Sequence, residues 1–190
     1  MGSLFTAARP IVLVGCGNMG KALLKGWLDN GIPSDAIYVV EPAGPDNAIE
    51  AGLPKSQVFA EAPTDLRAGI LMAAVKPQIM ADALPPVAHL IDEDTILLSI
   101  AAGTTLRVLK ELTGQTDLVI RAMPNTPAAI GEGITVACPK SVLNGAQAAQ
   151  VDMLLSAGGI VRWVDDEGDM DVVTAISGSG PAYVLSLIHI

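Results

Sequence analysis

The chain has 190 residues, of which 51% are hydrophobic and 16% charged, and its 20 acidic against 11 basic side chains give a formal net charge of −9. This composition excludes an intrinsically disordered chain, and the lack of a Lys/Arg cluster argues against a nucleic-acid surface. No apolar run reaches the roughly 18 residues of a membrane span, and residues 1–9 lack the apolar core of a secretory signal. We therefore expect a globular cytoplasmic protein with neither membrane nor nucleic-acid partners.

Short apolar runs alternate along the chain with segments of helical pattern. The expected strands are 11–15, 37–40, 70–75, 95–100, 118–123, 133–137 and 160–163. The expected helices are 18–30, 78–90, 104–113 and 141–157, and another helical pattern starts at Met170. The strands read as continuous apolar runs, which predicts an α/β fold with a doubly wound parallel sheet covered on both faces. A domain boundary is expected near residues 165–168, with a helical segment over 166–190.

The first expected strand leads directly into a G-x-G-x-x-G sequence, residues 15–20, and a helix pattern follows at once. In a dinucleotide site the first glycine permits the tight turn, the second lets the backbone approach a pyrophosphate, and the third lets the helix pack on the strand. The helix N-terminus adds unpaired N–H groups and about half a positive charge. This context favours a dinucleotide site over an ordinary strand-to-helix turn.

Glu41 ends the second expected strand, about 20 residues after the glycine sequence, where an acidic side chain accepts hydrogen bonds from the adenosine ribose. The alternative is a solvated charge at a strand end. A carboxylate about 4 Å from a 2′-phosphate would repel it by about 4 kcal/mol per unit charge at an effective dielectric of about 20. Because no Arg or Lys lies within residues 42–51 to offset this, we predict a preference for NADH over NADPH.

Three later strand ends also carry residues suited to a site, because ligands of open α/β sheets bind at the carboxyl ends of strands. Lys76 is followed by Pro77, which keeps it extended and starts a helix. Small residues at 101–103 leave room for a flat ring, and prolines on either side of Asn125-Thr126 stiffen that loop. The alternatives are a solvated lysine and well-made turns.

The segment Ser177-Gly-Ser-Gly-Pro-Ala-Tyr183 interrupts the last helical pattern. Proline inside a helix costs about 3 kcal/mol, and each glycine adds about 1 kcal/mol. Close packing of another element, or of a ligand, against this side-chain-free surface would justify the cost. We favour the ligand.

Few other side chains point to chemistry. Cys16 and Cys138 lack Cys-x-x-Cys spacing, as in a reduced compartment, and Cys16 is expected to be a small packing residue rather than a reactive thiol. The two histidines, His89 and His189, are far apart. We expect no bound metal and no hydrolytic reaction.

Five of these segments, in this order, resemble the pyrroline-5-carboxylate reductase family: residues 15–20, 75–78, 99–103, 123–127 and 177–183. The resemblance covers about residues 10–184. It implies a Rossmann domain over 1–165 and, over 166–190, the first helix of an all-α dimerisation domain, in a homodimer or larger oligomer. It also implies hydride transfer from NAD(P)H to the C=N carbon of 1-pyrroline-5-carboxylate, giving L-proline.

The resemblance assigns roles to individual residues. Cofactor contacts are expected at Gly15, Cys16, Gly17, Asn18, Met19, Gly20, Glu41, Ala74, Val75, Lys76, Pro77, Ala101, Ala102, Gly103 and Asn125. Substrate contacts are expected at Ser177, Gly178, Ser179 and Gly180. No strong general acid is evident; Lys76 is the best polar candidate for a catalytic role, as a positioning group rather than a proton donor.

The C-terminal end departs from the family, which continues well beyond this point with a Pro-Gly-Gly-Thr type loop for the substrate carboxylate. Nothing here matches that loop, and the ending Leu-Ser-Leu-Ile-His-Ile also differs. We expect a truncated chain in which residues 186–190 are not native. The alternatives are therefore a catalytically inactive dinucleotide-binding fragment, or a related hydroxyacid or imine reductase with another substrate.

Overall fold

The computed structural model describes residues 5–114 and 116–178, and within them eight strands form one sheet in the order β3-β2-β1-β4-β5-β6-β7-β8. The strands are β1 (Ile11–Val14), β2 (Ile37–Val40), β3 (Val58–Phe59), β4 (Ile70–Ala73), β5 (Ile96–Ser99), β6 (Val119–Pro124), β7 (Gly133–Pro139) and β8 (Gly159–Trp163). The α-helices are α1 (Asn18–Asp29), α2 (Asp46–Glu50), α3 (Met80–Ala83), α4 (Leu106–Thr113), α5 (Gly145–Leu155) and α6 (Asp169–Val173).

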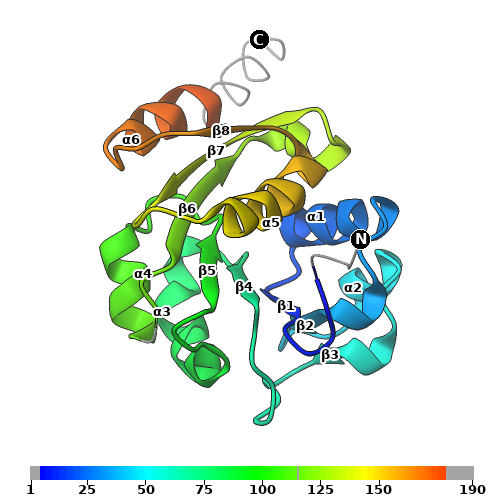
Figure 1. Ribbon diagram of the computed structural model, residues 1–190. Coiled ribbons are helices and arrows are strands. Elements are labelled where there is room, and N and C mark those ends of the chain that lie inside the picture. The colour runs from blue at the N-terminus through cyan, green and yellow to red at the C-terminus, as the bar shows by residue number, and fades with distance from the viewer. Residues whose placement is uncertain (1–4, 115, 179–190) are drawn as a thin grey trace.

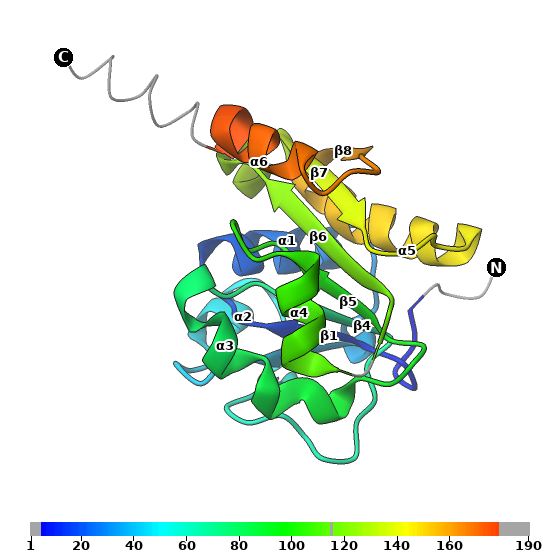
Figure 2. The same cartoon turned by 90° about the vertical axis from the view of Figure 1, so that its left-hand side faces the viewer.

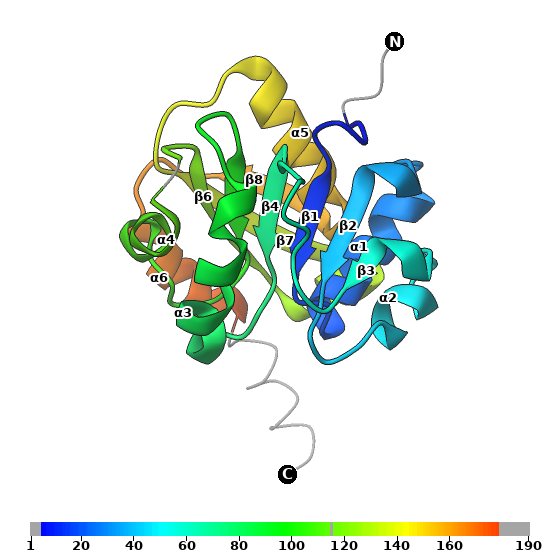
Figure 3. The ribbon, with the colours of Figure 1, turned by 90° about the horizontal axis from the view of Figure 1, so that it is seen from below.

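Helices cover both faces of the sheet, with α3 and α4 on one side and α1 and α2 on the other (Figures 1 and 3). Alternate residues of β1 point to opposite faces. Ile11 and Leu13 join a core that includes buried side chains of α1 and α5. Val12 and Val14 join a second core with buried side chains of α3, α4 and α6. The predicted doubly wound α/β fold is confirmed.

The prediction of an entirely parallel sheet is wrong at one pair, because β6 and β7 are antiparallel whereas the other pairs are parallel. A parallel connection needs a crossover of a dozen or more residues. Only residues 125–132 separate β6 from β7, and they form a 3₁₀ turn (Thr126–Ile130) that ends at Gly131 in the left-handed conformation, φ 76°. The chain therefore reverses beside itself.

Several helices differ from the predicted ranges. The segment 78–90 is two 3₁₀ helices, Pro77–Ile79 and Pro85–Leu90, on either side of the single turn of α3, because consecutive prolines lack the N–H groups of a continuous helix. Helix α5 begins only at Gly145, after Asn144 caps the N–H groups of Ala146 and Gln147. The short elements β3 and α2 were not predicted.

The segment that follows β8, residues 164–173, packs against the sheet, and Figure 2 shows α6 beside β7 and β8. Met170 of α6 is fully buried. The buried Arg121 of β6 pairs with Glu167 at 3.4 Å and with Asp171 at 3.2 Å. Beyond α6 the backbone forms a π-helical segment, Thr174–Gly178. The expected domain boundary at residue 165 stays a prediction.

An ion pair joins the segment before β1 to the turn before β5. Arg9 donates to both oxygens of Asp92, at 2.5 and 2.9 Å, and this hydrogen bonding lowers the pKa of Asp92 to about 2. The folded pKa lies below the unfolded value of about 3.8, so the stabilisation is complete above that pH and is lost as the pH falls toward 2. About a third of each side chain is exposed, so solvent screening keeps the contribution near 1 kcal/mol or less.

We therefore expect Asp92→Asn to lower the free energy of unfolding by up to about 1 kcal/mol at pH 7 and by much less at pH 2.5. Urea unfolding of both proteins at the two pH values measures the difference. An equal loss at both would show that the pair does not act through the charge of Asp92.

Candidate functional site

At the centre of the sheet, the chain leaves the carboxyl ends of β1 and β4 toward opposite faces. These strands are neighbours, yet the chain continues from β1 into α1 on one face and from β4 into α3 on the other. Such a switch point is where open α/β sheets bind ligands. A cavity of about 920 Å³ lies here. Its wall is formed by Val14, Gly15, Gly17, Val40, Glu41, Pro42, Ala60, Glu61, Ala62, Ala74, Val75, Lys76, Ile79, Asp82, Ala83, Pro86 and Val87.

The glycine sequence forms the turn between β1 and α1, and its glycines have different environments. Gly15 has φ 88°, and a Cβ atom there would lie 2.7 Å from Val75 Cγ1. A Cβ atom on Gly20 would lie 2.6 Å from the Gly15 carbonyl oxygen, whereas one on Gly17 would meet nothing within 4 Å. Gly15 and Gly20 therefore serve the tight turn, while Gly17 leaves open space at the cavity wall.

The N-terminus of α1 lacks a side-chain cap. Gly17 is the N-cap residue and supplies no side-chain capping hydrogen bond, and the first turn contains no acidic residue. The first N–H groups of a helix have no partner within it, and the dipole of this 12-residue helix places partial positive charge beside them. Open space at Gly17 next to these donors fits the pyrophosphate of a dinucleotide.

The Glu41 carboxylate is fixed at the cavity wall by backbone hydrogen bonds. Its Oε2 accepts from the Cys16 N–H at 2.7 Å, and its Oε1 accepts from the Ala43 N–H at 3.1 Å. The Glu41 N–H donates to the Phe59 carbonyl at 2.8 Å, which holds the end of β2 beside the end of β3. Each oxygen keeps acceptor capacity for a further donor, such as a ribose hydroxyl.

Cys16 is buried in the core on the α1 side of the sheet. Burial, with a smaller contribution from the nearby Glu41, raises the pKa of its thiol to about 11. The thiol is therefore protonated at neutral pH, which fits the expected packing role better than that of a reactive thiol.

The structure distributes the other predicted site residues along the same edge of the sheet. Lys76 is exposed, lines the cavity and has extended backbone before the 3₁₀ helix that Pro77 begins. Residues 101–103 follow β5 and Asn125 follows β6, outside the cavity wall. The Asn125 Oδ1 accepts from the Ile134 N–H at 2.9 Å, which ties the end of β6 to β7.

The remaining predicted cofactor and substrate contacts lie outside the cavity wall or beyond the described residues. Five predicted cofactor contacts are not among the wall residues but lie within three positions of one in sequence: Cys16, Asn18, Met19, Gly20 and Pro77. For the predicted substrate contacts, the backbone of Ser177 and Gly178 belongs to the π-helical segment. Ser179 and Gly180 lie outside the described residues.

Sequence reasoning missed the wall residues that follow β3, such as Glu61, and those of α3, such as Asp82. The pairing of Val40 with Phe59 carries residues 60–62 alongside residues 41 and 42. A strand of two residues gives no periodic pattern, so the signal was too short to read. These residues make the wall acidic, and Lys76 is the single cation among the described residues that line it.

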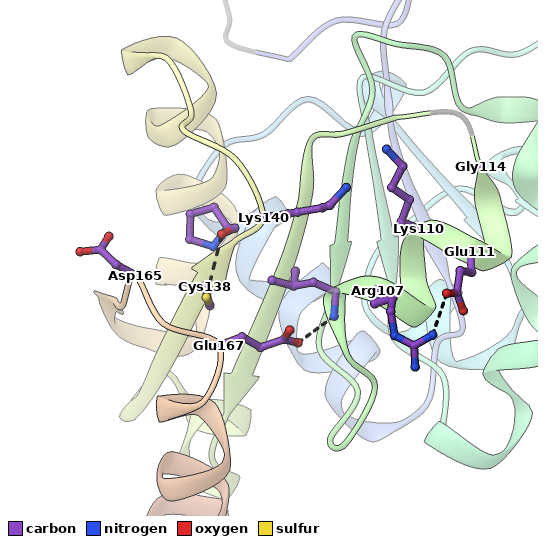
Figure 4. Close-up of a pocket in the computed structure, with 10 residues that line it drawn as sticks. Arg107, Lys110, Glu111, Gly114, Cys138, Lys140, Asp165 and Glu167 are labelled. Atoms are coloured by element: carbon purple, nitrogen blue, oxygen red, sulfur yellow. Dashed lines mark hydrogen bonds and ion pairs between the residues drawn. The ribbon is translucent and has the colours of Figure 1, made fainter.

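A second cavity, of about 670 Å³, lies between α4 and the segments after β7 and β8 (Figure 4). Arg107 pairs with Glu111 at 2.7 Å, and Lys140 pairs with Asp117 at 2.8 Å. The Glu167 carboxylate accepts the Leu106 N–H at 2.7 Å and also pairs with Arg121. These charged groups are engaged in ion pairs and hydrogen bonds within the protein.

The comparisons with known proteins agree with this geometry. The family model described as "NADP oxidoreductase coenzyme F420-dependent" matches residues 10–103. In the part of the chain that the structure describes, no helix is long and apolar enough to cross a membrane. The fold and the glycine turn define the chain as a Rossmann-type domain, and the description of the matching family model is that of an oxidoreductase.

Individual relatives narrow this class. The chain is 37% identical over 182 residues to a pyrroline-5-carboxylate reductase of Pseudomonas aeruginosa, covering 94% of this chain and 66% of that protein. It is 35% identical over 193 residues to the pyrroline-5-carboxylate reductase of Escherichia coli, and the match covers 95% of this chain and 68% of that protein. The chain belongs to the pyrroline-5-carboxylate reductase family, and it spans about 66% of the length of the first of these relatives.

Solved structures agree with this assignment. The pyrroline-5-carboxylate reductase of Coxiella burnetii superposes with a TM-score of 0.83 at 25% identity, covering 96% of this chain and 68% of that one. The Plasmodium falciparum pyrroline carboxylate reductase, solved with NADP bound, gives a TM-score of 0.78 at 27% identity, covering 97% and 68%.

Proposed function

We propose that the protein is a pyrroline-5-carboxylate reductase, which transfers a hydride from NAD(P)H to the C=N carbon of 1-pyrroline-5-carboxylate and, with one proton, forms L-proline. The observation that carries the cofactor part is the open space at Gly17 beside the uncapped N-terminus of α1. The substrate comes from the relatives, which bear this enzyme's name.

We infer that residues 15–20 hold the pyrophosphate and that Glu41 accepts the adenosine ribose hydroxyls. Residues 74–77 and 101–103 line the nicotinamide half, with Asn125 nearby, and residues 177–180 contact the substrate. The cofactor supplies the hydride, and the protein supplies orientation and charge complementarity. Lys76, the cation of an acidic wall, serves as a positioning group for an anionic part of cofactor or substrate.

We also propose that the protein is cytoplasmic and forms a homodimer or larger oligomer through a helical domain that begins within residues 166–190. The two cysteines are free and buried, as suits a reduced compartment. Sedimentation equilibrium of the purified chain tests the oligomer. Self-association into a dimer or larger species supports this arrangement, and a monomer counts against it.

The direct test of the proposed reaction is to mix the purified chain with 1-pyrroline-5-carboxylate and either NADH or NADPH. Absorbance of the reduced nicotinamide follows oxidation, and mass spectrometry detects proline. Cofactor oxidation that requires the imine and yields an equal amount of proline supports the reductase. Dinucleotide binding without any imine-dependent oxidation counts against this activity in the 190-residue chain.

We further propose that Glu41 makes NADH the preferred cofactor. Its carboxylate is held at the wall by two backbone N–H groups, so it cannot easily turn away from a 2′-phosphate. We expect NADH to bind at least about fivefold more tightly than NADPH, because even a quarter of the 4 kcal/mol repulsion gives that ratio. Fluorescence titration with each cofactor measures the two dissociation constants.

The matched variants are Glu41→Gln, which removes the charge and keeps one oxygen for the Cys16 N–H, and Asp65→Asn. Asp65 is an exposed carboxylate outside the cavity wall. Glu41→Gln should bring the two dissociation constants closer together, whereas Asp65→Asn should leave their ratio unchanged. Equal affinities for NADH and NADPH in the unmodified chain would refute the preference.

A further inference from the structure

The two peptide groups on either side of Cys16 are both held by side chains from the segment after β2. The Cys16 N–H donates to Glu41 Oε2 at 2.7 Å. The Cys16 carbonyl accepts from Asn47 Nδ2 at 2.8 Å. Glu41 follows β2 directly and Asn47 lies in α2. Residues 41–47 therefore hold Cys16, in the middle of the glycine turn, by two hydrogen bonds.

The bond from Asn47 sets the direction of a second group, the N–H of Gly17. The Cys16 carbonyl and the Gly17 N–H belong to one planar peptide unit, and in a trans unit they point in opposite directions. No peptide among the described residues is cis. Because the carbonyl points to Asn47, the Gly17 N–H points away from α2.

This N–H is available to a ligand. Within the part of the chain that the structure describes, the Gly17 N–H has no protein acceptor. Gly17 itself is exposed and lines the 920 Å³ cavity. An unpaired donor at the N-cap of α1 adds to the first-turn N–H groups that favour an anion.

Helix α2, which contains Asn47, packs on the same core as the glycine turn. Ala48, the next residue of α2, is buried in the core that also contains Cys16. Ala51 and Leu53, just beyond α2, are buried there as well. The amide of Asn47 thus starts from backbone that is packed on the same core as the turn.

We propose that Asn47 is a positioning residue of the dinucleotide site, which orients the Gly17 N–H toward the pyrophosphate by holding the Cys16 carbonyl. This role depends on the proposed function, since the ligand is the cofactor of that reaction. Asn47 contacts the glycine turn rather than the cofactor. It affects cofactor binding by fixing the orientation of the peptide unit between Cys16 and Gly17.

The test compares Asn47→Leu, which removes the amide at similar size and without a charge change, with Asn47→Gln, which keeps an amide donor. Dissociation constants are measured for NADH, for ADP-ribose, which retains the pyrophosphate, and for adenosine, which lacks it. We expect Asn47→Leu to raise the dissociation constants for NADH and ADP-ribose by about 3- to 10-fold, as for loss of one net hydrogen bond. Adenosine affinity should change less than about twofold, and Asn47→Gln should recover most of the NADH affinity.

The NMR spectrum of the backbone amides gives a second measurement, and a general loss of stability would not produce the expected change in it. NADH should shift the Gly17 N–H resonance strongly in the unmodified chain and less in Asn47→Leu, at a temperature where thermal unfolding shows both to be folded. Unchanged NADH affinity in Asn47→Leu, or an equal loss for adenosine, would overturn the role of Asn47 alone. If the unmodified chain binds no dinucleotide, the proposed cofactor site fails as well; if it binds but does not reduce the imine, only the reaction fails.

Discussion

Gly17→Ala is expected to leave the chain folded, with a free energy of unfolding within about 1 kcal/mol of the original, and to weaken NADH binding by at least about tenfold. The backbone of Gly17, φ −70° and ψ −167°, is open to any L-residue, and a Cβ atom there meets nothing within 4 Å. The same methyl group would stand in the open space beside the N–H groups of α1. It would therefore hold the pyrophosphate away from its donors.

Gly15→Ala is the matched control, because it adds the same methyl group two residues earlier. Gly15 has φ 88°, and its Cβ would lie 2.7 Å from Val75 Cγ1 and 3.0 Å from the Ala74 carbonyl oxygen. Positive φ and crowding together should lower the free energy of unfolding by about 2 to 3 kcal/mol. Urea unfolding and NADH titration separate the variants. A Gly17→Ala chain that binds NADH normally would place the pyrophosphate elsewhere.

The glycine turn could be predicted because its requirements are local. A strand, a positive φ at Gly15 and a helix start at Asn18 all lie within a few residues, and each depends on residue types visible in the sequence. Glu41 was found in the same way, from its distance along the chain to the turn. The hydrogen bonds that Glu41 accepts from the Cys16 and Ala43 N–H groups could not be predicted in this way, since they depend on how β2 lies beside β1.

Other features depend on contacts between distant segments, and sequence patterns do not encode these directly. Strand β7 looks the same whether it runs parallel or antiparallel to β6, because both of its faces are covered. The wall residue Glu61 reaches the site only through the two-residue strand β3. Asn47 gave no signal at all, because its partner is a backbone carbonyl 31 residues away.

Trp27→Ala is expected to lower the free energy of unfolding by about 4 kcal/mol, the largest effect of a single substitution that we predict. Trp27 is fully buried in α1, and its Nε1–H donates to the Leu154 carbonyl of α5 at 2.9 Å. The substitution removes the ring from the core that α1 and α5 share and leaves that carbonyl without its donor. The other tryptophan, Trp163, donates to Asp152 at 2.8 Å in an exposed bond, so Trp163→Phe should cost about 1 kcal/mol or less.

Urea unfolding followed by circular dichroism measures both losses without relying on either indole. Small domains are stable by about 5 to 15 kcal/mol, so a loss of about 4 kcal/mol leaves Trp27→Ala with little reserve. The N-terminus of α1 carries the glycine turn, and Trp27 anchors the same helix two turns further on. NADH should therefore raise the unfolding midpoint of Trp27→Ala by mass action, because binding requires a packed α1. Equal costs for the two tryptophans would show that α1 is held chiefly by other contacts.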